Sequence, residues 1–346
     1  MKKRSEFNFC LAFGILSFAF AQGVQADYHQ NDEIIGDDTS VTYSGQAAAF
    51  RATVLGLPLA VSDTGALPSQ GGALEASLLD IALPLPGAGN LVAQVFHATS
   101  IGQGKQSSSE ASLANLDLTL GLNAIKADFL MSRAAVSCTK SMLSASHIAG
   151  LNINGKAVVI TGQPNQVINL IAGSIIINEQ IKISSNNSSS VTVNALHIKI
   201  NGLADVVISS AHADMSCTIN PPCGSQDFVT GGGYITTGTN KKSNFAVAGG
   251  IKNNAGWGHL TYIDHGTGMK VHGTGVTSYE IINKTTRRIK GTAKLDNNTN
   301  ITYTATVSDA GEPGINDTFR LQLSNGYDTA TRLLSGGNIQ LHKPCN

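Results

Sequence analysis

The sequence has 346 residues with 23 basic and 23 acidic side chains, so its formal net charge at pH 7 is zero. Charged residues make up 13% of the chain, about half of the usual ~25%, while glycine occurs 37 times. This balance excludes the basic surface of a nucleic-acid-binding protein, and abundant Thr, Val, Ile, Asn and Gly predict strands and turns rather than helices.

The first 26 residues have the features of a secretory signal peptide. A basic head, Lys2–Arg4, precedes an apolar run, Cys10–Phe20, and the small-residue cleavage site Val24–Ala26, with Ala19–Ala21 as the alternative site. The run is shorter than the ~20 residues that span a bilayer, and no comparable stretch follows, so no transmembrane segment is expected in the mature chain. We expect a protein that begins at Asp27, carries a formal charge of −2, and is secreted or associated with the cell surface, with the periplasm as the alternative.

About 320 mature residues predict two domains. The polar segment 27–38 is expected to be a flexible arm. The segment 39–217 is predicted as a first β domain, 218–226 as a linker marked by Pro221-Pro222, and 227–346 as a second β domain. The predicted fold class is therefore all-β, with two antiparallel β-sandwich or flattened-barrel domains in tandem.

Strand patterns support this organisation. In the first domain, apolar-rich segments separated by Gly, Pro, Asn and Ser clusters cover 47–57, 73–83, 91–101, 111–120 and 124–136. Asn201-Gly202 lies between two alternating segments and predicts a type I′ hairpin, and Asn154-Gly155 gives a similar signal. In the second domain, pairs such as Leu260 and Tyr262 place alternate side chains on one strand face. Such short connections leave no room for crossover helices.

The mature chain holds four cysteines, Cys138, Cys217, Cys223 and Cys345, which an oxidising compartment would pair. Four cysteines allow three connectivities, and the proline pair in the linker favours one bridge on each side of it, Cys138–Cys217 and Cys223–Cys345. Zinc binding is the alternative, but the five residues between Cys217 and Cys223 exceed the usual ligand spacing.

Two parts of the chain resemble known bacterial families. The first resembles the choice-of-anchor P domain of surface proteins over roughly 40–217, in the segments 48–56, 71–77, 95–104, 127–134 and 206–214. The second resembles the post-COAP-1 domain, in 228–235, 258–265, 309–319 and 336–342. The resemblance implies an exported protein displayed on, or shed from, the envelope, and it implies no activity. Because 343–346 contain no sortase motif or apolar tail, we expect free secretion, a periplasmic location or non-covalent attachment.

Two groups of residues are candidate metal ligands. His265 and His272 each begin a His-Gly-Thr-Gly sequence, and with Asp264 they offer groups that suit Zn²⁺ or Cu²⁺; the alternative is ordinary hairpin turns. The loop with Asp309, Glu312, Asn316 and Asp317 gathers oxygen ligands of the kind that Ca²⁺ prefers. Its alternative is an acidic turn whose side chains cap their own backbone. No cofactor is expected, with calcium in this loop as the alternative.

Catalytic motifs are missing from the sequence, which has no Gly-x-Ser-x-Gly elbow and no His-Glu-x-x-His. His212 and Asp214 with His97 could form a triad, but a structural pair on one strand face explains them as well. Trp257, in a Gly-Trp-Gly loop, is the candidate for a sugar-binding ring.

The sequence therefore predicts a non-enzymatic, disulfide-bonded exported protein with no catalytic residues. It would act by binding an envelope or extracellular polymer, or by self-association. A glycan-binding module and a metal-dependent hydrolase are the alternative functions.

Overall fold

The computed structural model describes residues 41–217, 224–238, 240–296 and 299–344, which belong to one compact unit. They form antiparallel strands, and the one helical segment within these ranges is a short 3₁₀ turn, η1 (Gly314–Asn316). The predicted all-β fold class is confirmed. The predicted signal peptide, 1–26, and arm, 27–38, lie outside the described residues.

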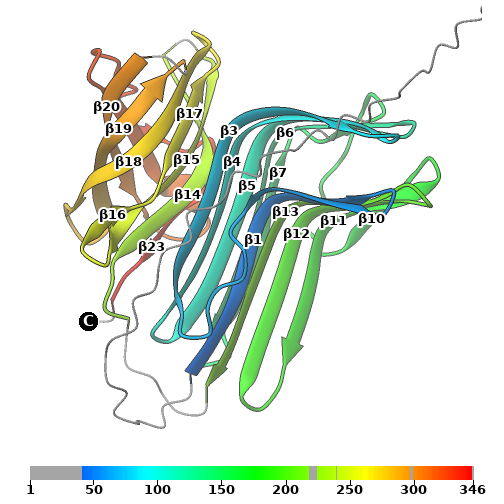
Figure 1. The fold of residues 1–346 in the computed structure, drawn as a ribbon, viewed down its shortest axis with the longest axis horizontal. Coiled ribbons are helices and arrows are strands. Elements are labelled where there is room, and N and C mark those ends of the chain that lie inside the picture. The colour runs from blue at the N-terminus through cyan, green and yellow to red at the C-terminus, as the bar shows by residue number, and fades with distance from the viewer. Residues whose placement is uncertain (1–40, 218–223, 239, 297–298, 345–346) are drawn as a thin grey trace, which may run out of the picture. The chain divides into compact units, whose positions relative to one another are not determined.

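Sheet A and sheet B are built from the first half of the chain (Figure 1). Sheet A has the order β10 (Gln166–Leu170), β11 (Gly173–Ser184), β12 (Ser188–Ile200), β13 (Ala204–Cys217), β1 (Val41–Val54), β2 (Leu57–Asp63). Sheet B has the order β3 (Gly72–Leu85), β4 (Gly89–Gln103), β5 (Gln106–Leu120), β6 (Asn123–Ser137), β8 (Asn152–Ile153), β9 (Lys156–Ala157), and β7 (Met142–Ala149) also pairs with β6.

The main hydrophobic core lies between these two sheets. It includes the fully buried Phe50 of β1, Phe96 of β4, Leu113 of β5, Leu196 of β12 and Ile208 of β13. Both sheets supply the inward-facing members of alternating strands, as the sequence pattern predicted.

Most of the predicted strands and both predicted turns of the first domain are present. Asn201-Gly202 joins β12 to β13, and Asn154-Gly155 joins the two-residue strands β8 and β9. The predicted strand 47–57 is wrong at its end, because the chain turns at Leu55-Gly56 between β1 and β2. An apolar residue at a turn tip hid this turn from the sequence pattern.

One predicted disulfide is confirmed. Cys138, just after β6, is bonded to Cys217 at the end of β13, so the bridge ties sheet B to sheet A across 79 residues of sequence. The other predicted bridge, Cys223–Cys345, lies outside the described residues.

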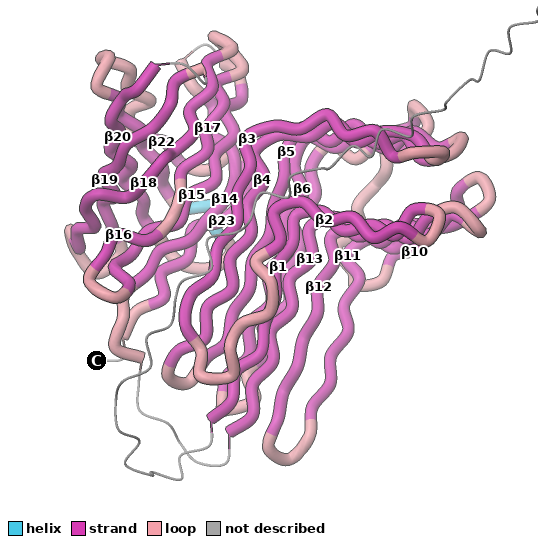
Figure 2. Tube along the Cα trace, in the orientation of Figure 1, coloured by secondary structure: helices cyan, strands magenta, loops and turns pink. Residues whose placement is uncertain are grey.

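Sheet C is formed by the second half of the chain, and curls around its own core (Figure 2). Its order is β22 (Arg332–Leu333), β21 (Thr318–Leu323), β20 (Thr299–Ser308), β19 (Thr286–Leu295), β18 (Met269–Ile281), β17 (Leu260–Asp264), β15 (Lys242–Lys252), β14 (Phe228–Thr236), β23 (Gly336–His342), and β16 (Ala255–Trp257) pairs with β15. The predicted alternation holds here, since Leu260 and Tyr262 both face this core, where Phe245 and Phe319 stack with ring centroids 4.0 Å apart.

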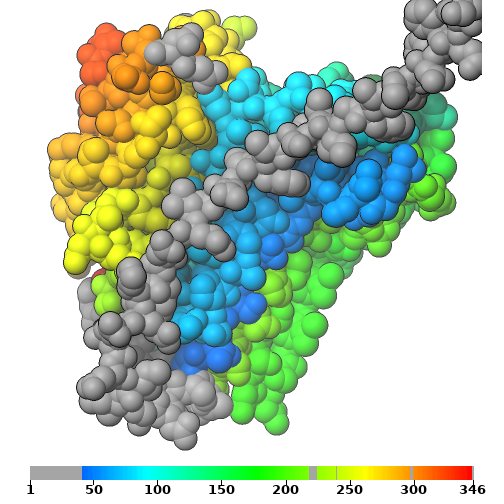
Figure 3. Space-filling model, in the orientation of Figure 1, coloured from blue at the N-terminus to red at the C-terminus, as the bar shows by residue number. Residues whose placement is uncertain are grey.

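The outer face of sheet C packs against sheet B, and the surfaces of the two meet directly in Figure 3. Phe129 of β6 contacts Tyr234 of β14, with ring centroids 5.8 Å apart. Gly232 permits the close approach of β14, because a Cβ atom at this position would lie 2.4 Å from the hydroxyl oxygen of Ser112 on β5. Both faces of β14 are therefore buried, one in each core.

Candidate functional site

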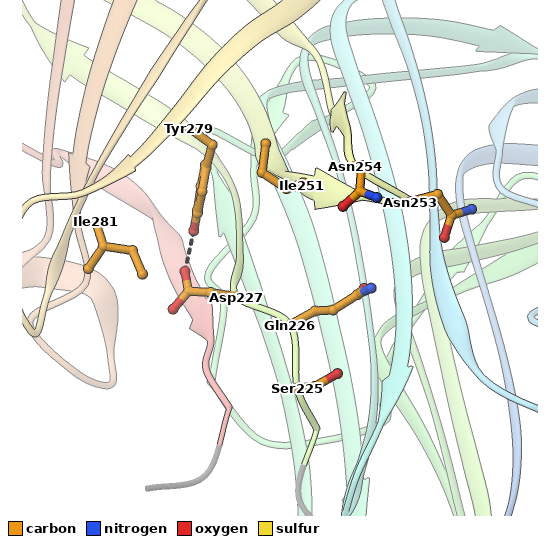
Figure 4. A pocket seen from close by; sticks show the side chains of 8 residues that line it. All are labelled: Ser225, Gln226, Asp227, Ile251, Asn253, Asn254, Tyr279 and Ile281. Atoms are coloured by element: carbon orange, nitrogen blue, oxygen red, sulfur yellow. Dashed lines mark hydrogen bonds between the residues drawn. The ribbon is translucent and has the colours of Figure 1, made fainter.

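A pocket of about 460 Å³ lies at the start of sheet C (Figure 4). Its lining comes from Ser225–Asp227 before β14, from the hairpin between β15 and β16, and from the end of β18. This volume lies within the ~300–1,000 Å³ range of small-molecule sites. The pocket is therefore large enough for an organic ligand such as one or two sugar rings.

The carboxylate at the pocket is neutralised from within the protein. Arg287 of β19, of which 2% is exposed, donates two hydrogen bonds to Asp227, at 2.6 and 2.7 Å. The hydroxyl of Tyr279 donates a third hydrogen bond to the same carboxylate. The hydrogen bond from Arg287 to Asp227 raises the pKa of the guanidinium, and burial raises the pKa of the Tyr279 hydroxyl. The floor of the pocket thus carries no net charge.

Uncharged polar groups surround this neutral pair. Asn253 and Asn254 form the two-residue turn between β15 and β16, with φ angles of 51° and 60°. Their side chains, and those of Gln226 and Ser225, have no hydrogen-bond partner within the part of the chain that the structure describes. Amides both donate and accept hydrogen bonds. The pocket therefore presents three free amides and a hydroxyl.

Two apolar side chains complete the lining. Ile251 at the end of β15 and Ile281 at the end of β18 are both exposed. They lie on either side of Tyr279 in Figure 4. A ligand held here would meet hydrogen-bonding groups and apolar side chains next to each other.

A second cluster, which is buried, crosses the boundary between sheets B and C. Nδ1 of His97 on β4 is 2.9 Å from Nε2 of His259, which lies between β16 and β17. The other ring nitrogen of His97 is 3.1 Å from Oε1 of Glu110 on β5. Nδ1 of His259 is hydrogen-bonded to Glu75 of β3. Four titratable side chains thus form one continuous chain of hydrogen bonds.

The pKa directions assign the protons in this chain. Burial lowers the pKa of His97 well below 6.5, and burial raises the pKa of Glu110 to about 8. Burial also disfavours ionised Glu75, but the contacts with His259 outweigh it and leave its pKa below the usual value. Neutral His97 therefore donates from one ring nitrogen and accepts at the other, and His259 donates to ionised Glu75. Every link then has one donor and one acceptor, so an ion pair of His97 with Glu110 is not needed.

The predicted calcium ligands have partners in the protein. Carboxylates of Asp309 and Asp317 each accept two backbone N–H groups, one from their own loop and one from β23, at 2.8–2.9 Å. Glu312 accepts two hydrogen bonds from Arg133 of β6, at 2.5 and 2.6 Å. Asn316 ends η1. This geometry is that of a loop capped by its own side chains.

The other predicted metal ligands point to separate partners. Asp264 is buried and accepts hydrogen bonds from Ser243 and from Tyr327, at 3.3 and 3.0 Å. His265 contacts two amide side chains, and Nδ1 of His272 is buried with no partner among the described residues. Within the described ranges, no group of three or more His, Cys, Asp or Glu side chains is arranged to hold a metal ion.

Trp257 and the residues of the possible triad are also used in packing and hydrogen bonding. The Trp257 ring packs edge-on against Phe228, with ring centroids 5.1 Å apart. His212 is hydrogen-bonded to Thr192 at 2.9 Å, whereas the partners of His97 are His259 and Glu110, as described above. The triad that the sequence allowed is not assembled.

Sequence reasoning missed both clusters. The Asn253-Asn254 pair is a recognisable turn signal, but nothing in the sequence indicates that Gln226 and Ile281 lie beside it. Glu110 stands in a run of serines and alanines, with no signal for its burial. Tertiary contacts between sheets bring these residues together.

No protein-family model matches the chain, and comparisons with curated proteins and with solved structures gave no match. With three residues, the helical segment of the described ranges is far too short to cross a membrane.

Proposed function

We propose that this chain is an exported, non-catalytic binding protein of the envelope or extracellular space, and that its pocket holds part of an uncharged carbohydrate polymer. The observation that carries the proposal is that three amides without a side-chain partner among the described residues, Gln226, Asn253 and Asn254, line one pocket with a carboxylate that Arg287 neutralises.

The chemistry of the lining matches that of a sugar. Sugar hydroxyls both donate and accept hydrogen bonds, and so do amide side chains. The C–H face of a sugar ring is apolar and fits beside Ile251 or Ile281. A charged ligand would find no opposite charge here, because Asp227 and Arg287 already satisfy each other.

Export is supported by one observation besides the predicted signal peptide, and it agrees with the resemblance expected from sequence. The Cys138–Cys217 disulfide fits an oxidising compartment. The resemblance of the two halves to choice-of-anchor P and post-COAP-1 domains implies proteins of the bacterial cell surface. Free secretion, a periplasmic location and non-covalent surface attachment all agree with this proposal.

Binding is favoured over sugar hydrolysis by the carboxylates of the pocket. Glycosidases commonly use a pair of carboxyl groups, one as acid and the other as base or nucleophile. The lining of this pocket includes one carboxylate, Asp227, and three hydrogen bonds from Arg287 and Tyr279 hold it in place. The metal-dependent hydrolase is not proposed, because Asp264, Asp309 and Asp317 already accept hydrogen bonds from the protein.

Affinity electrophoresis through gels that contain neutral polysaccharides tests the proposal. The variant carrying both Asn253→Gly and Asn254→Gly removes two amides, and glycine keeps the positive φ angles of the turn. We expect retardation by at least one polysaccharide, and its loss in this variant. Asn240→Gly is the matched control, since Asn240 also has a positive φ, 56°, in a turn outside the pocket. Equal retardation of the parent and the double variant would refute the pocket assignment. The variant Trp257→Ala separately tests the sugar-binding ring predicted from sequence.

A further inference from the structure

Five turns gather at one end of the sandwich formed by sheets A and B. The turn between β1 and β2 is joined to the turn between β12 and β13 by a hydrogen bond from the N–H of Leu55 to the carbonyl of Leu203, at 2.9 Å. The turn between β5 and β6 is joined to that between β10 and β11, because the Asn123 amide exchanges two hydrogen bonds with the backbone of Ile171, at 3.0 Å each. The carbonyl of Ala88, in the turn between β3 and β4, accepts a hydrogen bond from the N–H of Gly121, in the turn between β5 and β6.

The tips of these turns carry large apolar side chains in water. The exposed fractions are 56% for Leu55, 63% for Leu57, 79% for Leu122 and 51% for Ile171. Pro86 in the turn between β3 and β4 is exposed as well. Turn tips usually carry Gly, Asn, Asp or Ser, because these residues suit both the backbone and the solvent. We call this set of four side chains, Leu55, Leu57, Leu122 and Ile171, the apolar end.

The opposite end of the same strands is different. There the turn between β4 and β5 is Gly104-Lys105, the turn between β6 and β7 includes Thr139-Lys140, and the turn between β11 and β12 is Ser185–Asn187. The two ends share the same strands and have similarly short turns. Strand geometry therefore does not explain the leucines of the apolar end.

Leu55 has a backbone conformation that is unfavourable for leucine. Its φ angle is 49°, in the left-handed region that glycine and asparagine adopt readily and leucine does not. Asn-Gly would satisfy this turn, whereas the chain has Leu55-Gly56. A residue that is unfavourable both for its backbone conformation and for its exposure points to a role in binding.

The shape and size of the apolar end favour a lipid surface over a second protein. Leu55 and Leu57 lie at the turn between β1 and β2, while Leu122 and Ile171 lie in two other turns, so the apolar side chains project at three places along this end. Four partly exposed side chains of this size present a few hundred Å², whereas a stable protein interface buries ~800 Å² on each partner. Isolated apolar contacts of this kind are typical of peripheral membrane binding.

The charges beside the apolar end identify the kind of lipid. Lys126 is paired with Asp117 at 2.7 Å, and Lys199 is paired with Asp205 at 3.9 Å. Lys156, the first residue of β9 beside the Asn154-Gly155 turn, has no ion-pair partner among the described residues. The net charge beside the apolar end is therefore close to zero. Among the described residues named here, Lys156 is left to contact a headgroup phosphate. A zwitterionic phospholipid matches this arrangement.

We propose that the apolar end docks the protein onto a phospholipid surface by inserting Leu55, Leu57, Leu122 and Ile171 into the boundary between headgroups and acyl chains. This attachment needs no covalent anchor and is independent of the pocket in sheet C.

Flotation of the chain from Asp27 onward with phosphatidylcholine vesicles tests the docking. The triple variant Leu55→Asn, Leu122→Asn, Ile171→Asn replaces apolar tips by residues that favour turns, so its thermal unfolding is expected to match or exceed that of the parent. We expect the parent to float with the vesicles. The affinity of the triple variant for the vesicles should be lower by a factor of about ten or more. Ile183→Asn is the matched control, because Ile183 is 63% exposed on β11 near the opposite end.

A second measurement reports insertion directly. Leu122→Trp places a fluorophore at the most exposed tip, and brominated phosphatidylcholine should quench its emission relative to the parent, whose single tryptophan is Trp257. Parent protein that stays unbound, a triple variant that binds like the parent, or Leu122→Trp that is not quenched would each overturn the proposal. So would a parent dimer that the triple substitution converts to monomers, since a second copy would then cover the apolar end.

Discussion

The rings of His97 and His259, 162 positions apart in sequence, are joined by a 2.9 Å hydrogen bond between sheet B and the start of β17. The bond is the middle link of the chain from Glu110 to Glu75. Burial keeps His97 neutral, and each ring nitrogen of His97 and His259 has a hydrogen-bond partner. A buried chain of hydrogen bonds that crosses from sheet B to sheet C favours one packing of the two sheets.

Glu110→Gln should change how stability depends on pH. The pKa of Glu110 is about 8 in the folded protein against 4.5 when unfolded, so the folded state holds the proton longer. Its contribution to stability is fully present below about pH 4.5 and is lost as pH rises to about 8. Glutamine donates the same hydrogen bond to His97 but does not titrate. Urea unfolding at pH 5, 6, 7 and 8 should show that this loss is absent in the variant.

His97 provides the opposite dependence and serves as the internal check. Its pKa lies well below 6.5 in the folded protein, so the unfolded state binds a proton first and stability is lost as pH falls below 6.5. The Glu110→Gln variant should still lose stability as the pH falls below 6.5. Arg133 Nε lies 3.9 Å from Glu110 Oε2. A variant that is less stable than the parent by several kcal/mol at every pH would mean that Glu110 is ionised beside this guanidinium.

Removal of the Cys138–Cys217 bridge should lower stability substantially. The bridge closes a segment of 79 residues, and the chain-entropy model assigns about 4 kcal/mol to a loop of this length. The double variant Cys138→Ser, Cys217→Ser should therefore unfold at lower urea concentration than the oxidised parent. Reduced parent protein is the control, and identical midpoints for oxidised and reduced parent would contradict the prediction.

Asp227→Ala should be far more damaging than the loss of one surface charge. Arg287 would be left buried with no carboxylate, which typically costs about 3–5 kcal/mol. Adding Arg287→Met to this variant removes the stranded charge and should recover much of the loss. Chemical unfolding of the two single variants and the double variant measures the coupling, and strictly additive effects would show that the pair does not interact.

Leu55→Asn should stabilise the protein even though it removes an apolar side chain. The left-handed conformation of Leu55 costs leucine roughly 1 kcal/mol more than asparagine, and the exposed side chain contributes little to the core. Differential scanning calorimetry should show a rise in Tm of a few degrees. A lower Tm would indicate that the side chain makes a stabilising contact at the apolar end.

The sequence pattern succeeded where local signals are strong. Alternation and Asn-Gly turns located β12 and β13, and the proline pair indicated which partner Cys138 takes. It failed at Leu55-Gly56, where an apolar residue occupies a turn position and made the turn look like strand. The candidate metal ligands had the right chemistry, yet the backbone N–H groups of β23 and the Arg133 side chain engage the acidic loop in the structure.

By itself, the sequence determined the all-β class and the antiparallel arrangement, because both depend on alternation and turn residues along the chain. It favoured one of three cysteine connectivities, and the structure decided that Cys138 is bonded to Cys217. Only the tertiary structure decided that Glu75, His97, Glu110 and His259 form one buried chain, and that Gln226 faces Asn254 across a pocket. These contacts join strands of different sheets or distant turns, and a period of two along a strand says which face a side chain occupies but not which other face will cover it.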